Sequence, residues 1–213
     1  YAGPIKIEGY PDSGDFLVGP LAAPGTYQVQ IKEGDQTYTA DFEIRKDPRI
    51  PTTQEDLQAQ FELLLAIRNK LSETHNTIKT VRDIRRQVEE WERRAEGHDA
   101  RETVVAASKP LKEKLTAIEG ELFQAKAKDQ VDMLDFPIQL NAKIAVLANV
   151  VASGDTAPTR QVQQVFEEFS ARLGTQLQRL QEIIGTDLAA FNKLIQESGM
   201  PAVIPAAQEQ EQK

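Results

Sequence analysis

Residues 52–95 read TTQEDLQAQFELLLAIRNKLSETHNTIKTVRDIRRQVEEWERRA, and this stretch decides the fold class. Its apolar residues recur at steps of three, four and seven, which places them on one stripe of an α-helix. The stripe consists of Leu57, Phe61, Leu64, Leu71, Ile78, Val81, Ile84, Val88, Trp91 and Ala95. No proline or glycine interrupts the stretch, so it predicts one helix of about 44 residues, roughly 65 Å long. Residues 52–55 have the form of a capping box that starts this helix.

Two more helices are predicted directly after it. A second capping pattern at residues 99–102 starts a helix in which Pro110 should cause a kink or a split, because proline lacks the amide donor that a helix needs. Residues 126–137 form a polar break. Residues 140–151 then predict a short helix, and because Val146 and Val150 extend its apolar stripe nearly all round, we expect it to lie centrally in the fold.

The last predicted helix starts near Thr159 and runs to Gly199, where glycine and the following Pro201 should end it. Gly185, followed by Thr186-Asp187, predicts a bend within this helix. The tail at residues 200–213 consists mostly of Pro, Ala, Gln and Glu, a composition that predicts disorder.

The first 51 residues have a different pattern. Apolar and polar residues alternate at residues 27–32 and again at 38–45, and this period of two predicts half-buried strands. The intervening residues 33–36 include a glycine suited to a tight turn, so the two runs predict a hairpin. Residues 5–7 and 16–18 are weaker strand candidates, and the prolines at 48 and 51 end the β region.

The predicted β segment is too short to be a complete domain. An immunoglobulin-like sandwich needs about seven strands and about 100 residues. We therefore expect the apolar face of the hairpin to be covered by the N-terminal strands, the ends of the long helices or strands outside this sequence, and at least one sheet edge to stay unpaired. The predicted fold class is mainly α with a small β part: an antiparallel bundle of long helices (52–199) preceded by an incomplete immunoglobulin-like β segment (1–51).

Composition limits the classes of partner. The chain has 213 residues, no cysteine and a formal net charge of −8. An acidic surface repels a phosphate backbone, which disfavours nucleic acid as a partner. The apolar runs are too short for a transmembrane helix. The sequence begins at Tyr1 without a methionine or a signal peptide, so we expect a processed chain or a piece of a longer one.

No stretch of the sequence predicts an active site, a cofactor site or a metal site. The histidines, His75 and His98, lack the spacing of a metal-binding or catalytic pair and are expected to be a hydrogen-bonded residue of the helix stripe and a solvated turn residue. The acids Asp129, Asp132 and Asp135 do not follow a calcium-loop pattern.

Other charged residues are expected to be surface groups. The adjacent pairs Glu89-Glu90 and Glu167-Glu168 point about 100° apart on a helix, so they are expected to be solvated and not paired for glycoside hydrolysis. The basic run between Arg82 and Arg94 alternates with acids at ion-pair spacing, as in Glu89 with Arg93 and Glu90 with Arg94.

Several motifs resemble the C-terminal region of bacterial exported β-propeller proteins with sortilin-like or BNR/sialidase-type repeats, often labelled glycosyl hydrolases. The resembling segments are residues 19–29 (GPLAAPGTYQV), 42–49 (FEIRKDPR), 115–119 (LTAIE), 136–141 (FPIQLN) and 153–159 (SGDTAPT). In such proteins an immunoglobulin-like strand pair leads into long helices. The Asp-box repeats of the propeller do not occur here, so no catalytic or ligand-binding residue of the family can be placed on this chain.

The resemblance implies a non-catalytic structural or protein-interaction module at the C-terminal end of an exported propeller protein, whether periplasmic, cell-surface or secreted. The upstream propeller would be its partner, and self-association through the free sheet edge is a further possibility. The alternative is a carbohydrate-binding or glycoside-hydrolase accessory module that uses exposed aromatics such as Tyr1, Tyr10 and Trp91. An enzyme is the third reading, but the chain has no convergent catalytic motif.

Overall fold

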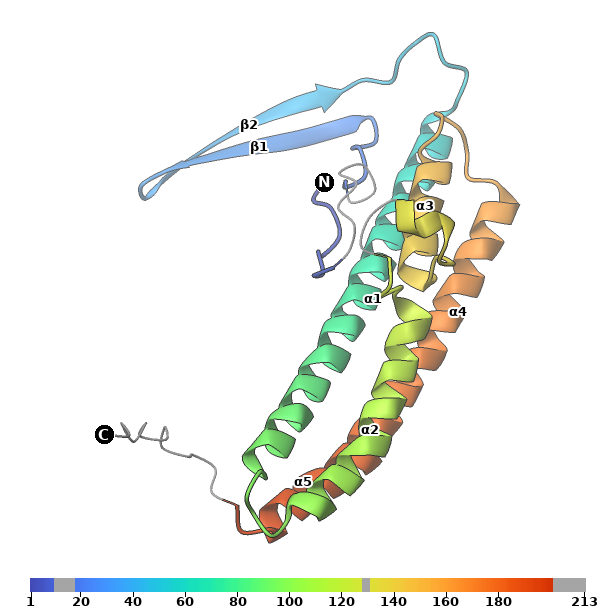
Figure 1. The fold of residues 1–213 in the computed structure, drawn as a ribbon. Coiled ribbons are helices and arrows are strands. Elements are labelled where there is room, and N and C mark those ends of the chain that lie inside the picture. Colours follow the sequence, from blue (N-terminus) through green and yellow to red (C-terminus); the bar gives the residue numbers. More distant parts are fainter. Residues whose placement is uncertain (10–17, 128–130, 201–213) are drawn as a thin grey trace.

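The computed structural model describes residues 1–9, 18–127 and 131–200, and it confirms a mainly helical chain with a small antiparallel sheet near the N-terminus (Figure 1). The strands are β1 (Gly25–Glu33) and β2 (Gln36–Ile44). The helical elements are α1 (Gln54–Arg94), α2 (Arg101–Leu122), the 3₁₀ turn η1 (Val131–Leu134), α3 (Leu140–Val151), α4 (Arg160–Glu182), the π-helical segment η2 (Ile183–Leu188) and α5 (Ala189–Glu197).

The helices form an antiparallel bundle with α1 as its longest member. Helices α2 and α3 follow one another back along α1, and α4 with α5 then runs the length of the bundle again (Figure 1). The predicted stripes meet in one core, in which Ile78 and Val81 of α1, Leu115 of α2, Ile144 of α3 and Leu173 of α4 are all fully buried. Burial of these stripes against one another is the main stabilising contribution to the helical part.

The predicted capping box of α1 is wrong by one residue. Thr53 is the N-cap: its hydroxyl accepts a hydrogen bond from the Asp56 amide at 3.1 Å, and the Asp56 carboxylate accepts one from the Thr53 amide at 3.4 Å. Thr52 instead donates its hydroxyl to the Asp155 carbonyl, which joins the start of α1 to the loop before α4. Because Thr52 and Thr53 are adjacent and are followed by Glu55 and Asp56, the sequence fits a capping box that starts at either threonine.

The predicted cap of α2 at Asp99 is also wrong. The N-cap is Ala100, whose side chain makes no cap hydrogen bond. Instead, Nδ1 of His98 accepts a hydrogen bond from the Ala100 amide at 3.1 Å. The turn histidine therefore satisfies a backbone donor at the start of α2, where the sequence pattern predicts a cap by the aspartate.

Pro110 does not split α2, which is helical without interruption from Arg101 to Leu122. The proline removes the amide that would bond to the Ala106 carbonyl, but both residues are on the exposed side of the helix, where water can satisfy that carbonyl. On the opposite side Leu111 and Leu115 are buried, and their packing holds the helix along the core.

The last long helix changes its winding where the sequence predicts a bend. Gly185 and Thr186-Asp187 lie inside η2, a π-helical segment between α4 and α5, and do not restart a helix. The Asp187 carboxylate accepts an ion-paired hydrogen bond from Lys114 of α2 at 2.6 Å. Helix α5 ends at Glu197 before Gly199, which has a left-handed φ of +70°, as predicted. Of the predicted disordered tail, only Met200 is among the described residues.

Helix α3 spans the predicted apolar stripe from Leu140 to Val151 but is not buried all round. It packs against α1, α2 and α4 through residues such as Leu140, Ile144 and Leu147. Val146 and Val150, which prompted the prediction of a central helix, are 42% and 51% exposed. The apolar pattern therefore overstated the burial, because in the described part of the chain three helices pack against α3 and leave Val146 and Val150 partly exposed.

The N-terminal segment does not form the predicted strand at residues 5–7. Ile7 is buried, and Ile5 is held against α1: its amide donates to the Ser72 hydroxyl at 3.2 Å, and its carbonyl accepts from Nδ1 of His75. The segment thus packs on a helix instead of pairing with a strand. Most of the other weak strand candidate, residues 16–18, lies outside the described residues.

Candidate functional site

The β-hairpin is the most distinctive surface of the molecule. Its two-residue turn places Gly34 at a left-handed φ of +57°, which glycine adopts at little cost. The register pairs Tyr27 with Phe42, Val29 with Ala40 and Ile31 with Tyr38. Since side chains alternate across a strand, all of these residues share one face of the hairpin.

That apolar face is open to solvent. The exposed fractions are 44% for Val29, 62% for Ile31, 53% for Tyr38 and 47% for Phe42. The ring of Phe42 lies 5.9 Å from that of Tyr27, centroid to centroid, so the aromatics pack on each other but not on the bundle. We call the set Tyr27, Val29, Ile31, Tyr38, Ala40 and Phe42 the apolar hairpin face.

The opposite face of the hairpin is polar throughout. It consists of Thr26, Gln28, Gln30, Lys32, Thr37, Thr39, Asp41 and Glu43. Gln28 donates to the Asp41 carboxylate at 3.1 Å across the strands. The hairpin therefore has one face suited to water and one suited to burial.

The described part of the chain does not cover the apolar hairpin face. Strands β1 and β2 contact each other and no other described helix or strand, and the hairpin projects from one end of the bundle (Figure 1). The described N-terminal segment interacts with this face at Tyr27, through Tyr1, but Ile5 of that segment is bound to α1. The expectation that this segment or the helix ends would cover the face is therefore wrong for Val29, Ile31, Tyr38 and Phe42, which stay exposed. Because the sheet has two strands among the described residues, each strand also has an edge unpaired within that part of the chain, as predicted.

The base of the hairpin is joined to the bundle by hydrogen bonds. Gln54 donates to the Pro24 carbonyl at 2.7 Å, and Lys46 donates to the Thr52 carbonyl at 2.6 Å. The hydroxyl of Tyr27 donates to the Ala23 carbonyl at 2.7 Å. The hairpin thus has a fixed base and a projecting tip.

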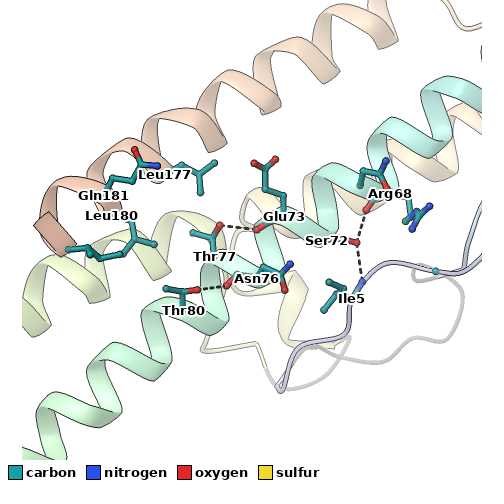
Figure 2. A pocket seen from close by; sticks show the side chains of 13 residues that line it. Ile5, Arg68, Ser72, Glu73, Asn76, Thr77, Thr80, Leu177, Leu180 and Gln181 are labelled. Carbon is teal, nitrogen blue, oxygen red and sulfur yellow. Dashed lines mark hydrogen bonds between the residues drawn. The ribbon is translucent and has the colours of Figure 1, made fainter. Parts of the chain in front are cut away.

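A groove of about 610 Å³ lies between α1 and α4, and Ile5 of the N-terminal segment also lines it (Figure 2). Leu177, Leu180 and Gln181 of α4 lie opposite a polar row on α1. The hydroxyls of that row are used within the helix: Ser72 donates to the Arg68 carbonyl, Thr77 to the Glu73 carbonyl and Thr80 to the Asn76 carbonyl. Glu73 is paired with Lys70 at 2.7 Å. These groups are therefore committed to structural contacts.

The histidines have structural positions. His75 is fully buried, and because the Ile5 carbonyl can only accept, Nδ1 of His75 bears the proton. Burial lowers the pKa of His75 despite the opposing contribution of that hydrogen bond. His98 caps the amide of Ala100, as described above.

Of the three acids that do not follow a calcium-loop pattern, Asp132 lies in η1 and Asp135 directly follows it, whereas Asp129 is outside the described residues. Within the described ranges, no group of three or more His, Asp or Glu side chains is placed to hold a metal ion. Glu89 is exposed, as are Glu167 and Glu168 on α4.

Of the two ion pairs predicted on α1, one is confirmed. Glu90 accepts from Arg94 at 3.0 Å, and this contact holds the pKa of Glu90 below its usual value. Arg93, however, approaches Glu90 at 3.8 Å and not the predicted Glu89.

The aromatics of the carbohydrate-binding alternative are not brought together. Tyr1 is 60% exposed and its ring lies 4.8 Å from that of Phe61. Trp91 packs partly against the core, with the Arg94 guanidinium 5.0 Å from its ring. Phe61 and Trp91 are 30 residues apart on α1, which corresponds to about 45 Å. Tyr10 lies outside the described residues.

One buried charge cluster was not predicted from the sequence. Glu119 of α2, with only 8% of its side chain exposed, accepts from Arg82 and from Arg85 of α1 at 2.6 Å each. Arg82 also donates to the Glu8 carbonyl at 2.7 Å. The cluster thus binds α1, α2 and the N-terminal segment together, a structural role that spacing within one helix could not reveal.

Comparison with known proteins found no match: no family model, no curated protein and no solved structure is similar to this chain. Among the described helices, none is both long and apolar enough to span a bilayer.

Proposed function

We propose that this chain is a non-catalytic protein-interaction module, the C-terminal part of a larger exported propeller protein, and that its hairpin docks onto a neighbouring β-structured part of that protein. One observation supports the proposal above the others. The apolar hairpin face is fixed at its base, projects from the bundle and has four large side chains between 44% and 62% exposed.

Burial of this face would stabilise the hairpin. A two-stranded hairpin by itself is marginal in water. Full burial of one large apolar side chain contributes about 1.5–3 kcal/mol relative to exposure. The side chains of Val29, Ile31, Tyr38 and Phe42 are each about half exposed, so each could gain about half of that contribution. A partner surface that covers them would turn a marginal element into a stable one.

The size of the face favours a partner in the same polypeptide over a second copy. Two strands of nine residues present a face of about 30 Å by 10 Å, roughly 300 Å². Stable complexes between separate proteins bury about 800 Å² on each side. A tethered partner needs less contact area, because its effective concentration reaches roughly millimolar values.

The test compares this chain with the polypeptide encoded by its complete gene, using hydrogen exchange read out by mass spectrometry. We expect the amides of β1 and β2 to exchange at least tenfold more slowly in the longer polypeptide. Ile31→Lys should abolish that protection, since it places a charge on the apolar face. The control is Gln30→Lys, the adjacent residue on the polar face, which should leave the protection unchanged.

Equal exchange of the hairpin in the two polypeptides would contradict the proposal. So would equal effects of Ile31→Lys and Gln30→Lys, because docking through the apolar face must distinguish them. Sedimentation of the isolated chain up to high concentration tests whether a second copy covers the hairpin instead. Dimer formation that Ile31→Lys abolishes would support that alternative.

A further inference from the structure

A cleft of about 600 Å³ lies where the base of the hairpin meets the bundle. Leu21 and Pro24 line it from the segment before β1, Phe61 and Leu64 from α1, and Ala148 from α3. The cleft is thus lined by three separate parts of the chain and is mainly apolar. Its volume falls in the range of sites that bind small molecules.

Arg68 is the cation at the inner wall of this cleft. Its side chain is half-buried, and its Nε is buried without a hydrogen-bond partner. Within residues 1–9, 18–127 and 131–200, the guanidinium forms no ion pair with an acid. Arg68 lines both this cleft and the groove between α1 and α4 that Figure 2 shows.

The other charged groups of the cleft are either engaged or at its rim. Arg45 is paired with Glu43 at 2.8 Å, and Lys46 donates to backbone carbonyls. Asp47 is paired with Arg49 at 2.6 Å. Asp155 is exposed to solvent. Arg68 therefore differs from the other charged groups of the cleft in having a buried donor without a partner among the described residues.

We propose that the cleft binds a linear apolar molecule that ends in a carboxylate, such as a medium-chain fatty acid. A guanidinium presents a planar pair of N–H donors that matches a carboxylate, and the pairing is strongest where water is excluded. The carboxylate lies at Arg68 and the chain extends along Leu64 and Phe61 toward Leu21. This inference does not depend on the docking of the hairpin, since it uses the base of the hairpin and not its exposed face.

The experiment titrates the ¹⁵N-labelled chain with sodium decanoate below its micelle concentration. Decyltrimethylammonium, which has the same tail and the opposite charge, is the matched ligand control. We expect saturable shifts at Leu21, Leu64 and Ala148 with decanoate, and binding at least tenfold weaker with the cation. Equal affinity for the two amphiphiles, shifts confined to the groove at Leu177 and Gln181, or no saturation would overturn the proposal.

Variants then assign the anion contact. Arg68→Gln should weaken decanoate binding at least tenfold, whereas Arg93→Gln should leave it unchanged, because Arg93 is exposed near the far end of α1. Leu64→Trp fills the cleft without removing the cation and should also abolish binding, so a folding defect of one variant does not remove the test. Decanoate affinity unchanged in either cleft variant, with circular dichroism showing a folded chain, would refute the site.

Discussion

The hairpin and the helical bundle have the same kind of amino-acid pattern, but their apolar faces differ in burial. In both regions apolar residues recur at the period of the local structure, at three to four in the helices and at two in the strands. In the bundle, Ile78, Leu115 and Ile144 are fully buried by one another's helices, whereas Val29 and Phe42 of the hairpin stay about half exposed. A periodic pattern therefore specifies which face is suited to burial, but not what covers it.

The largest expected difference between the two regions is in hydrogen exchange. Amides of the bundle core, such as those of Ile78 and Val81, should exchange only through global unfolding, which costs about 5–15 kcal/mol in typical domains. Hairpin amides should exchange at least about 10³-fold faster, because the hairpin can open without disturbing the core. Mass spectrometry of the isolated chain measures both regions at once. If the hairpin amides were as protected as the core amides, the hairpin would be as stable as the bundle and the proposed difference between the two regions would be wrong.

The second-largest expected difference is in the unfolding free energy lost when an apolar side chain is truncated to alanine. Leu115→Ala is expected to cost about 2–5 kcal/mol of unfolding free energy, because Leu115 is fully buried. Phe42→Ala, at a site 47% exposed, should cost less than about 1 kcal/mol. Leu177, which the sequence places on a similar stripe, is only half-buried, so Leu177→Ala should fall between them. Urea denaturation gives the three values, and a larger loss for Phe42→Ala would show that the hairpin face is covered in solution.

Helix capping provides a smaller test of how the bundle begins. Thr53→Ala should cost about 1 kcal/mol, because the hydroxyl of Thr53 satisfies the Asp56 amide. Asp99→Ala should change stability by no more than about 0.5 kcal/mol, since Asp99 is exposed and does not cap α2. Urea denaturation measures both changes in unfolding free energy. A larger loss for Asp99→Ala than for Thr53→Ala would show that Asp99 caps α2, as the sequence pattern predicts.

The smallest expected effect is a pH dependence of the bundle that the hairpin does not share. Burial lowers the pKa of His75 in the folded chain, so the unfolded chain binds a proton more readily. The contribution of His75 to stability is therefore complete above the ordinary histidine pKa of about 6.5 and declines as the pH falls below it, until folded His75 is itself protonated. In His75→Asn, which keeps a donor for Ile5 and does not titrate, the melting temperature should fall less between pH 7 and pH 5. An equal fall in both proteins would show that other groups cause it.

Helices were predictable because their signals are local. The apolar stripe from Leu140 to Val151 identified α3, and α1 differs from its prediction by two residues at the start and one at the end. Errors arose where two local solutions compete, as at Thr52 and Thr53, or where the surroundings decide, as at Pro110, which does not split α2.

Contacts between distant segments were not predictable from spacing. Period-two alternation identified the apolar hairpin face, but whether it is covered depends on where the rest of the chain packs. Residues 5–7 alternate like a strand and instead pack on α1, through Ser72 and His75. Glu119 and its two arginine partners are more than 30 positions apart in sequence, and only the packing of α1 against α2 brings them together.

The base of the hairpin also determines how the molecule would respond to mechanical force. Both strands leave the bundle from the same end, so a pull on the turn at Gly34 stretches them in parallel and applies no shear between them. The tension passes instead into the base, where Lys46 holds Thr52, Gln54 holds Pro24, and Thr52 in turn holds Asp155. A load taken up at the tip is thereby shared between the start of the longest helix and the loop beside it, and the first bonds to break are those of the base.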